Sequence, residues 1–144
     1  MAIGTYEAYI ERMKKMRPNI YLNGECLDRM HCGNESGFWV MKQCYEIAND
    51  PAYADVCQVK SHVTGEIVNR CTHIHQSKDD LLKKQLMTRL ICHHVGGCMQ
   101  RCMGTDALNA IAVASYDCDK ATGTKYYDRF LKYLQYCRYL RNLS

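Results

Sequence analysis

Residues 77–97 carry the pattern that most constrains the fold. Ser77 can cap a helix N-terminus, and Asp79 and Asp80 follow in the first turn, where the helix dipole favours negative charge. Apolar residues then recur at helical spacing, at Leu82, Leu86, Leu90 and Ile91. Gly96 and Gly97 end the pattern. A long amphipathic helix is therefore expected here, and it must pack on other elements to bury its apolar face.

Other segments also predict helices. Residues 5–16 form an amphipathic pattern that begins at a capping Thr5 and must stop at Pro18. Residues 38–48 read as a buried helix that ends at Asn49-Asp50-Pro51.

The C-terminal half continues in the same way. The Ala-rich stretch 106–116, "DALNAIAVASY", predicts a closely packed helix. A loop is expected from residue 117 onwards in "DCDKATGTKYYDRF", with Thr124 as the next helix cap. The last helix has an apolar face of Tyr127, Phe130, Leu131, Leu134 and Cys137.

Extended structure is minor. The Asn23-Gly24 dipeptide between short apolar runs predicts a β-hairpin, and residues 28–35 read as a loop. Residues 52–74 give a mixed pattern, in which 62–71 alternates weakly around Gly65. With 144 residues and no internal repeat, the chain is expected to be a single, mainly helical domain with one minor hairpin.

Composition excludes several classes of protein. The net charge is +4, and basic residues alternate with acidic ones, so a nucleic-acid-binding stripe is not expected. No apolar run approaches the roughly 20 residues of a membrane span, and residues 1–16 lack the apolar core of a signal peptide. A cytoplasmic protein with no membrane contact is the expectation.

Ten cysteines are unusual for such a chain. A secreted disulfide scaffold would be smaller, rich in loops and led by a signal sequence. Here several cysteines lie within apolar helical patterns, as Cys44 does in "FWVMKQCYEIA" and Cys137 in "YLQYCRYL". Most of the thiols are therefore expected to be reduced and packed as small apolar groups.

The stretch "GGCMQRCMGTDA" (96–107) is the main candidate for chemistry. Cys98 and Cys102 are four residues apart, so on one helix they would share a face. The glycines before and after them would let a bulky ligand approach the backbone, and Arg101 could offset the charge of an anionic group. The same spacing also fits two packed core cysteines, or one cysteine acting as a nucleophile beside a histidine.

Two histidine-containing clusters are weaker candidates. Cys92, His93 and His94 precede Cys98 and could complete a zinc site, although the usual paired spacings of zinc ligands are absent. His73 and His75 share a face only if their segment is extended. Surface and capping roles remain the simpler interpretation of all these histidines.

At the level of whole segments, the chain resembles the 4-hydroxyphenylacetate 3-hydroxylase family of flavoproteins, and within it the branch that dehydrates 4-hydroxybutyryl-CoA. The resemblance is carried, in the order and at the spacing of the family, by "TYEAYIERM", "RPNIYLNGE", "CYEIANDPAYAD", "IHQSKDDLLKKQLMTRL", "CMQRCMGTDALNA" and "GTKYYDRFLKYLQY". These stretches cover nearly the whole chain. The two cysteines in the QRC-x-G-x-D-A context are specific to the dehydratase branch.

The resemblance implies a fold and a function. Residues 1–144 would be the helical N-terminal domain of an acyl-CoA-dehydrogenase-like fold, without its β-rich middle domain and C-terminal helical bundle. Dehydratases of this family are homotetramers that carry FAD and a [4Fe-4S] cluster, and they dehydrate an acyl-CoA substrate by radical chemistry. The cluster would then take Cys98 and Cys102 as two of its four ligands, and its other two ligands lie in a part of the family sequence not present here.

Two further points follow from the resemblance. Arg101 aligns with an arginine at the substrate pocket of the hydroxylase relatives, and "ICHHVGGC" departs from the family pattern. Other functions stay open from the residues themselves: a freestanding helical binding or assembly module without catalysis, or a small zinc-binding module that uses Cys92, His93 or His94 with Cys98.

Overall fold

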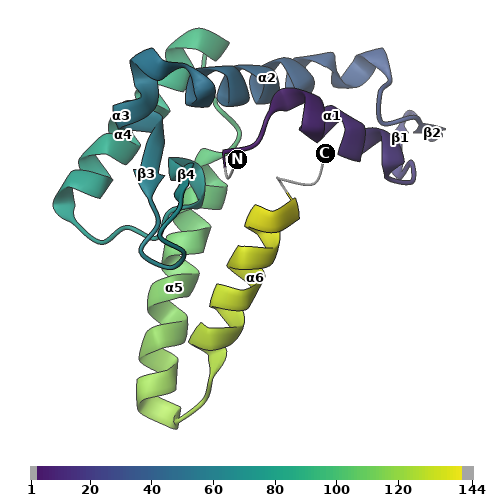
Figure 1. Ribbon diagram of the computed structural model, residues 1–144. Helices are drawn as coiled ribbons and strands as arrows, with labels where there is room; N and C mark the ends of the chain where they lie inside the picture. The colour runs from purple at the N-terminus through teal and green to yellow at the C-terminus, as the bar shows by residue number, and fades with distance from the viewer. Residues whose placement is uncertain (1–2, 141–144) are drawn as a thin grey trace.

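The computed structural model describes residues 3–140 of the chain (Figure 1). The elements follow in the order α1 (Tyr6–Lys15), β1 (Ile20–Leu22), β2 (Glu25–Leu27), η1 (Cys32–Asn34), α2 (Glu35–Asn49), η2 (Pro51–Tyr53), α3 (Ala54–Cys57), β3 (Gln58–Lys60), β4 (Ile67–Asn69), η3 (Arg70–Thr72), α4 (Lys78–Val95), α5 (Cys102–Thr122) and α6 (Tyr126–Leu140). Figure 1 shows a body built from the elements up to α4, from which α5 and α6 extend as an antiparallel pair. The predicted mainly helical fold is confirmed.

The first two helices form where the sequence predicts them. The Thr5 hydroxyl accepts a hydrogen bond from the N–H of Ala8 at 3.2 Å, which caps α1 as expected. The second helix begins at Glu35, three residues earlier than predicted, and follows directly on the short helix η1. At the far end of α2, the carboxylate of Asp50 accepts the N–H of Ala52 at 2.8 Å and starts η2.

Two hairpins form within residues 3–140, one more than predicted. The expected hairpin pairs β1 with β2, and its two turn residues adopt positive φ angles, 52° at Asn23 and 87° at Gly24. The second hairpin pairs β3 with β4 through Val59 and Val68. It lies within the segment whose alternation around Gly65 is weak, because β4 buries two successive residues, Val68 and Asn69.

The long helix α4 is confirmed, together with both of its ends. The Ser77 hydroxyl accepts the N–H of Asp80 at 3.1 Å, and Gly96 closes the helix with a φ of 73°. The predicted apolar face is confirmed only at its C-terminal end: Ile91 is buried and Leu90 packs against the core, whereas Leu82 is 59% exposed and Leu86 is 46% exposed. The buried residues of the helix are Asp80, Lys84, Met87 and Ile91. Polar residues can be buried here because ion pairs compensate them, such as Lys84 with Asp106 at 2.6 Å.

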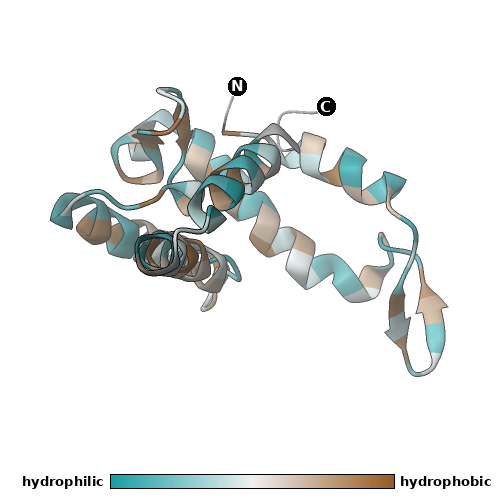
Figure 2. Ribbon diagram, turned by 90° about the horizontal axis from the view of Figure 1, so that it is seen from below, coloured by the Kyte–Doolittle hydropathy of each residue, from teal (hydrophilic) through white to brown (hydrophobic). Residues whose placement is uncertain are grey.

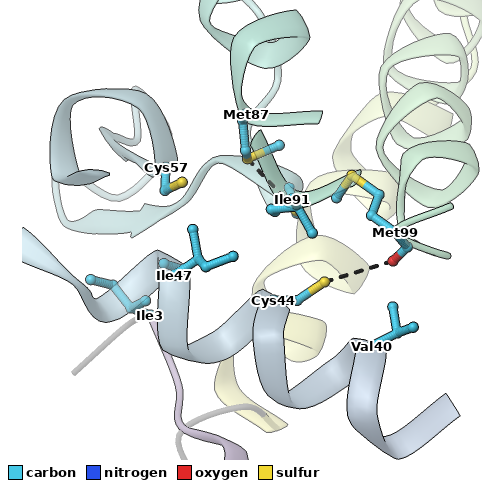
Figure 3. Close-up of a cluster of buried hydrophobic side chains, with 10 residues drawn as sticks. Ile3, Val40, Cys44, Ile47, Cys57, Met87, Ile91 and Met99 are labelled. Atoms are coloured by element: carbon cyan, nitrogen blue, oxygen red, sulfur yellow. Dashed lines mark hydrogen bonds between the residues drawn. The ribbon is translucent and has the colours of Figure 1, made fainter. Parts of the chain in front are cut away.

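The main core lies between α2, α3, α4 and the segment that leads into α5 (Figure 3). It contains several sulfur-bearing residues, and in Figure 3 the Cys44 thiol is directed at the carbonyl of Met99, 3.7 Å away. The buried members of this core are Ile3, Val40, Cys44, Ile47, Ala48, Cys57, Cys71, Met87, Ile91 and Met99. All ten cysteines are free thiols, and Cys44, Cys57 and Cys71 pack as small apolar groups. The expectation that most cysteines pack in this way is met only in part, because Cys26, Cys32 and Cys98 are exposed.

The α5–α6 pair has a smaller core of its own. Ile74, Ala112 and Leu134 are buried there, and they bring the extended segment before α4 against both helices. The hydropathy colouring of Figure 2, which looks at the molecule from below, shows apolar segments alternating with polar ones along the ribbon.

The loop predicted from residue 117 onwards is wrong in its extent. Helix α5 continues to Thr122, and α6 starts at Tyr126. The carboxylate of Asp119 explains the short connection, because it accepts the N–H groups of Tyr126 at 2.8 Å and Tyr127 at 2.9 Å. The start of α6 is therefore capped mainly by a side chain of the preceding helix, while the expected cap, Thr124, donates its hydroxyl to Asp119.

Candidate functional site

The segment between α4 and α5 holds both cysteines of the "GGCMQRCMGTDA" stretch. Because α4 ends at Val95 and α5 begins at Cys102, Cys98 lies in the connecting segment and only Cys102 belongs to a helix. The geometry of two cysteines on one helical face therefore does not apply. Cys98 is exposed, whereas Cys102 is half-buried and packs against the main core.

The backbone of this segment turns sharply. Gly97 has a φ of 158°, and Gln100 adopts a φ of 59°, a left-handed conformation that residues with a Cβ rarely take. In this conformation the N–H of Gln100 donates a hydrogen bond to the sulfur of Cys98 at 3.3 Å.

The N-terminus of α5 adds to the electropositive character of the segment. The first N–H groups of a helix are not used within it, and together with the helix dipole they favour negative charge close by. Cys102 is the first residue of this helix. The sulfur of Cys98 accepts a backbone N–H, and Cys102 stands at the start of a helix, so N–H groups surround this segment.

Arg101 is the charged residue of the site. Its guanidinium carbon lies 5.1 Å from the ring centroid of the buried Tyr45, an arrangement typical of a cation–π contact. The buried Nη1 atom of Arg101 has no hydrogen-bond partner among the described residues, and no carboxylate there forms an ion pair with it. Arg101 as a whole is half-buried, but a buried cationic N–H group without a partner is costly, so this environment suits an anionic or oxygen-bearing group.

Burial makes two thiols of the core, Cys44 and Cys57, weaker acids. Burial raises the pKa of Cys44 to about 11, although the neighbouring Arg101 guanidinium opposes the shift. Burial also raises the pKa of Cys57 to about 11. These two thiols are therefore protonated at neutral pH and unsuited to metal binding or nucleophilic attack.

A groove runs between α5 and α6 from the Arg101 end of the site. Its volume is about 650 Å³ and its walls are mostly apolar. The lining residues are Cys71, Thr72, Gln100, Arg101, Gly104, Thr105, Ala107, Leu108, Ile111, Arg129, Phe130, Tyr133, Leu134 and Cys137. The groove is therefore polar at the start of α5 and mostly apolar elsewhere.

A buried polar network holds the elements under the site in place. Arg70 of η3 donates to Asp80 of α4 at 3.0 Å, and Asp80 also accepts the N–H of Gln76 at 2.9 Å. Burial alone would raise the pKa of Asp80, but the Gln76 N–H, the His73 ring (charged at acid pH) and Arg70 together hold that pKa at about 2.

On α5, the Asn109 side chain donates to the carbonyl of His73 at 3.1 Å and accepts the N–H of His75 at 2.8 Å. This clamps the segment before α4 to α5.

The other candidate ligands do not assemble into a metal site. Within residues 3–140, no three His, Cys, Asp or Glu side chains are grouped as a bound metal ion would need. His93 and His94 are exposed, and His94 donates through Nδ1 to the carbonyl of Leu90 at 2.9 Å, a structural role. The structure thus gives no support to zinc binding by Cys92, His93 or His94 with Cys98.

His73 and His75 lie in an extended segment, as a shared face requires, with ring centroids 6.3 Å apart. Burial lowers the pKa of both. They serve the fold, because His73 contacts Asp80 at 3.4 Å within the polar network.

Sequence reasoning missed Gln100, Tyr45 and the Arg70–Asp80 pair. The left-handed conformation of Gln100 has no residue signature, since glycine would be the expected type there. Tyr45 and Arg70 come from segments distant in sequence, and only the fold brings them near Arg101 and Asp80 respectively. None of the helices described here is long and apolar enough to cross a lipid bilayer.

Comparison with known proteins gives consistent matches. Residues 5–141 match the family described as the 4-hydroxyphenylacetate 3-hydroxylase N-terminal region. The chain is 39% identical over 134 residues to the 4-hydroxybutyryl-CoA dehydratase/vinylacetyl-CoA-Δ-isomerase of Clostridium aminobutyricum, covering 92% of this chain and 27% of that protein.

Among solved structures, an oxygen-tolerant archaeal 4-hydroxybutyryl-CoA dehydratase from N. maritimus matches with a TM-score of 0.87 at 29% identity. That match covers 94% of this chain and 27% of the archaeal chain. The chain thus spans about a quarter of the length of these relatives, and the family model covers nearly all of it. The chain belongs to the 4-hydroxyphenylacetate 3-hydroxylase family, whose N-terminal region it matches.

Proposed function

We propose that this chain acts as the N-terminal domain of a 4-hydroxybutyryl-CoA dehydratase, which carries FAD and a [4Fe-4S] cluster, and that Cys98 and Cys102 supply two of the cluster ligands. The observation that carries the proposal is the 39% identity to the clostridial dehydratase across 92% of this chain. A β-rich middle domain and a C-terminal helical domain would complete the enzyme, which we expect to be a homotetramer in the cytoplasm.

The donor set fits half of such a site. An exposed thiol, a half-buried thiol at a helix N-terminus and a guanidinium without a counter-ion suit an anionic iron–sulfur cluster better than a neutral ligand. Two thiolates cannot hold four irons, so the remaining ligands must come from polypeptide outside these 144 residues.

The surface of the α5–α6 pair supports the same proposal. Ile111 is 52% exposed and Tyr133 is 65% exposed, and both line the apolar groove. Leu82 and Leu86 of α4 are also exposed. Apolar surface of this extent is expected to be covered in the working protein, and the further domains are the proposed cover.

The chemistry divides between the chain and its cofactors. When bound, the flavin and the cluster would supply electron transfer and Lewis acidity for removal of a C–H proton and the hydroxyl group of a 4-hydroxyacyl-CoA. This chain would contribute the two thiolate ligands and, through Arg101, a donor for an oxygen of the acyl-CoA substrate. The isolated chain is expected to be inactive.

Reconstitution from two chains tests the proposal. This chain is produced with a second chain corresponding to the part of the clostridial relative that follows the aligned region, and the pair is incubated anaerobically with iron, sulfide and FAD. We expect a stable complex with iron–sulfur absorbance and about four irons per pair. Cys98→Ala and Cys102→Ala should each remove most of the iron, whereas Cys118→Ala, elsewhere on α5, should not.

Two results would contradict the proposal. Unchanged iron content and absorbance in both variants would refute the ligand assignment. Failure of the two chains to associate, with a monodisperse and colourless single chain, would favour the alternative of a freestanding binding module.

A further inference from the structure

Among residues 96–102, Gln100 is the one residue other than glycine that adopts a left-handed backbone conformation. Such a conformation costs roughly 1–2 kcal/mol for a residue with a Cβ. Strain of this kind persists only where the surroundings impose it, and it is found most often at functional sites.

The conformation has one visible result, the hydrogen bond from the Gln100 N–H to the sulfur of Cys98 at 3.3 Å. The Gln100 side chain forms no hydrogen bond with any residue from 3 to 140, and the residue is exposed. The backbone of residue 100, and not its amide side chain, is therefore what acts on Cys98.

We propose that Gln100 is a positioning residue for Cys98: its left-handed backbone aims an N–H group at the sulfur and holds that sulfur in the orientation of a metal ligand. The inference rests on the proposed function only in taking Cys98 as a ligand. Hydrogen bonds to cysteine sulfurs stabilise the coordinated thiolate and set the reduction potential of iron–sulfur clusters. Groups that orient a metal ligand in this way typically contribute 10–100-fold to metal affinity.

A substitution series at residue 100 separates the backbone from the side chain. Gln100→Gly adopts the left-handed conformation without cost, and Gln100→Ala removes the amide group while keeping a Cβ. Gln100→Val carries a β-branched side chain, which strongly disfavours positive φ. If the backbone is responsible, Gly and Ala preserve the hydrogen bond and Val loses it.

Metal binding by this chain alone provides the measurement. Co²⁺ is the probe, and binding is followed by the sulfur-to-cobalt charge-transfer absorbance in a Cys26→Ser, Cys32→Ser background that removes two other exposed thiols. We expect Kd values close to the parent for Gln100→Gly and Gln100→Ala, and a Kd about 10–100-fold higher for Gln100→Val. A Gln100→Val variant that binds Co²⁺ as tightly as the parent overturns the inference.

The outcomes distinguish this inference from the proposed function. If Cys98→Ala keeps the charge-transfer absorbance, the ligand role of Cys98 fails. If Cys98→Ala loses it while Gln100→Val does not differ from the parent, only the positioning role fails.

A second measurement needs no substitution. With ¹¹³Cd²⁺ bound to the parent chain, an N–H···S–Cd hydrogen bond transmits a scalar coupling from the metal to the amide proton of Gln100. Observation of that coupling by NMR supports the inference even if Gln100→Val does not fold, and its absence refutes it.

Discussion

Replacement of Asp80 by asparagine tests the buried network beneath the site. Asp80 pairs with Arg70 at 3.0 Å, and the Arg70 side chain is 3% exposed. The folded state holds the pKa of Asp80 at about 2, below its ordinary value of 3.8. At 1.36 kcal/mol per pH unit, this difference corresponds to about 2 kcal/mol of folding stability at neutral pH.

The sign follows from proton binding. Because the folded-state pKa is the lower one, the unfolded chain binds more protons between the two values, and this stability is present above about pH 4 and lost as the pH falls towards 2. Asparagine resembles the protonated carboxyl group in shape and charge. Asp80→Asn should therefore lower the free energy of unfolding at pH 7 by about 2 kcal/mol, and the difference from the parent should shrink as the pH approaches 3.

Urea unfolding followed by far-UV circular dichroism, from pH 7 to about pH 3, measures both quantities. Asp79→Asn is the matched control, since Asp79 is one residue away on α4, its side chain is 65% exposed and it lies 3.6 Å from Lys83. We expect this control to differ from the parent by less than about 0.5 kcal/mol at every pH. A free-energy difference for Asp80→Asn that stays constant from pH 7 to 3 would refute the linkage reasoning.

Three further predictions concern burial and hydrogen bonding. Met87→Ala should lower the free energy of unfolding by about 2–5 kcal/mol, whereas Leu86→Ala, one position away but exposed in this chain, should change it by less than about 0.5 kcal/mol in the same urea assay. Asn109→Ala should cost about 1–3 kcal/mol, because it leaves the buried carbonyl of His73 without its donor. In the native chain iodoacetamide should alkylate Cys98 but not Cys44 as judged by peptide mass spectrometry, and equal labelling of the two would contradict the burial that raises the pKa of Cys44 to about 11.

Local signals predicted most of the helix ends. Thr5 and Ser77 cap helices because a hydroxyl close to a free N–H needs only neighbouring residues to form its bond. The Asn23-Gly24 turn is local in the same sense. The cap of α6 was missed because its acceptor, Asp119, comes from the preceding helix, seven residues before the first N–H it receives.

The buried face of α4 shows why hydropathy alone is insufficient. Apolar spacing correctly favours Leu90 and Ile91 as packed residues. It also favours Leu82 and Leu86, yet in the first half of the helix the structure packs Asp80 and Lys84, whose charges are compensated by Arg70 and Asp106 from other elements. A pairing between residues distant in sequence leaves no periodic signal. The apolar pattern of Leu82 and Leu86 is real, but these side chains are exposed in this chain. In our proposal, they pack against polypeptide outside these residues.

The candidate site was likewise predictable from the sequence only in part. The residue types Cys98, Arg101 and Cys102 stand in one short stretch, so the sequence alone could single them out. The fold shows that these three residues have different environments. Cys98 is exposed and accepts a hydrogen bond from the strained backbone of Gln100, and Cys102 is the first residue of a helix. The buried Nη1 of Arg101 has no hydrogen-bond partner among the described residues. Two of these features, the left-handed backbone of Gln100 and the unpartnered Nη1 of Arg101, cost free energy in the chain by itself, and an anionic cluster would offset the second. A ligand at this site should therefore stabilise the chain as well as occupy it, so Co²⁺ should raise the midpoint of urea unfolding in the parent and not in Cys98→Ala.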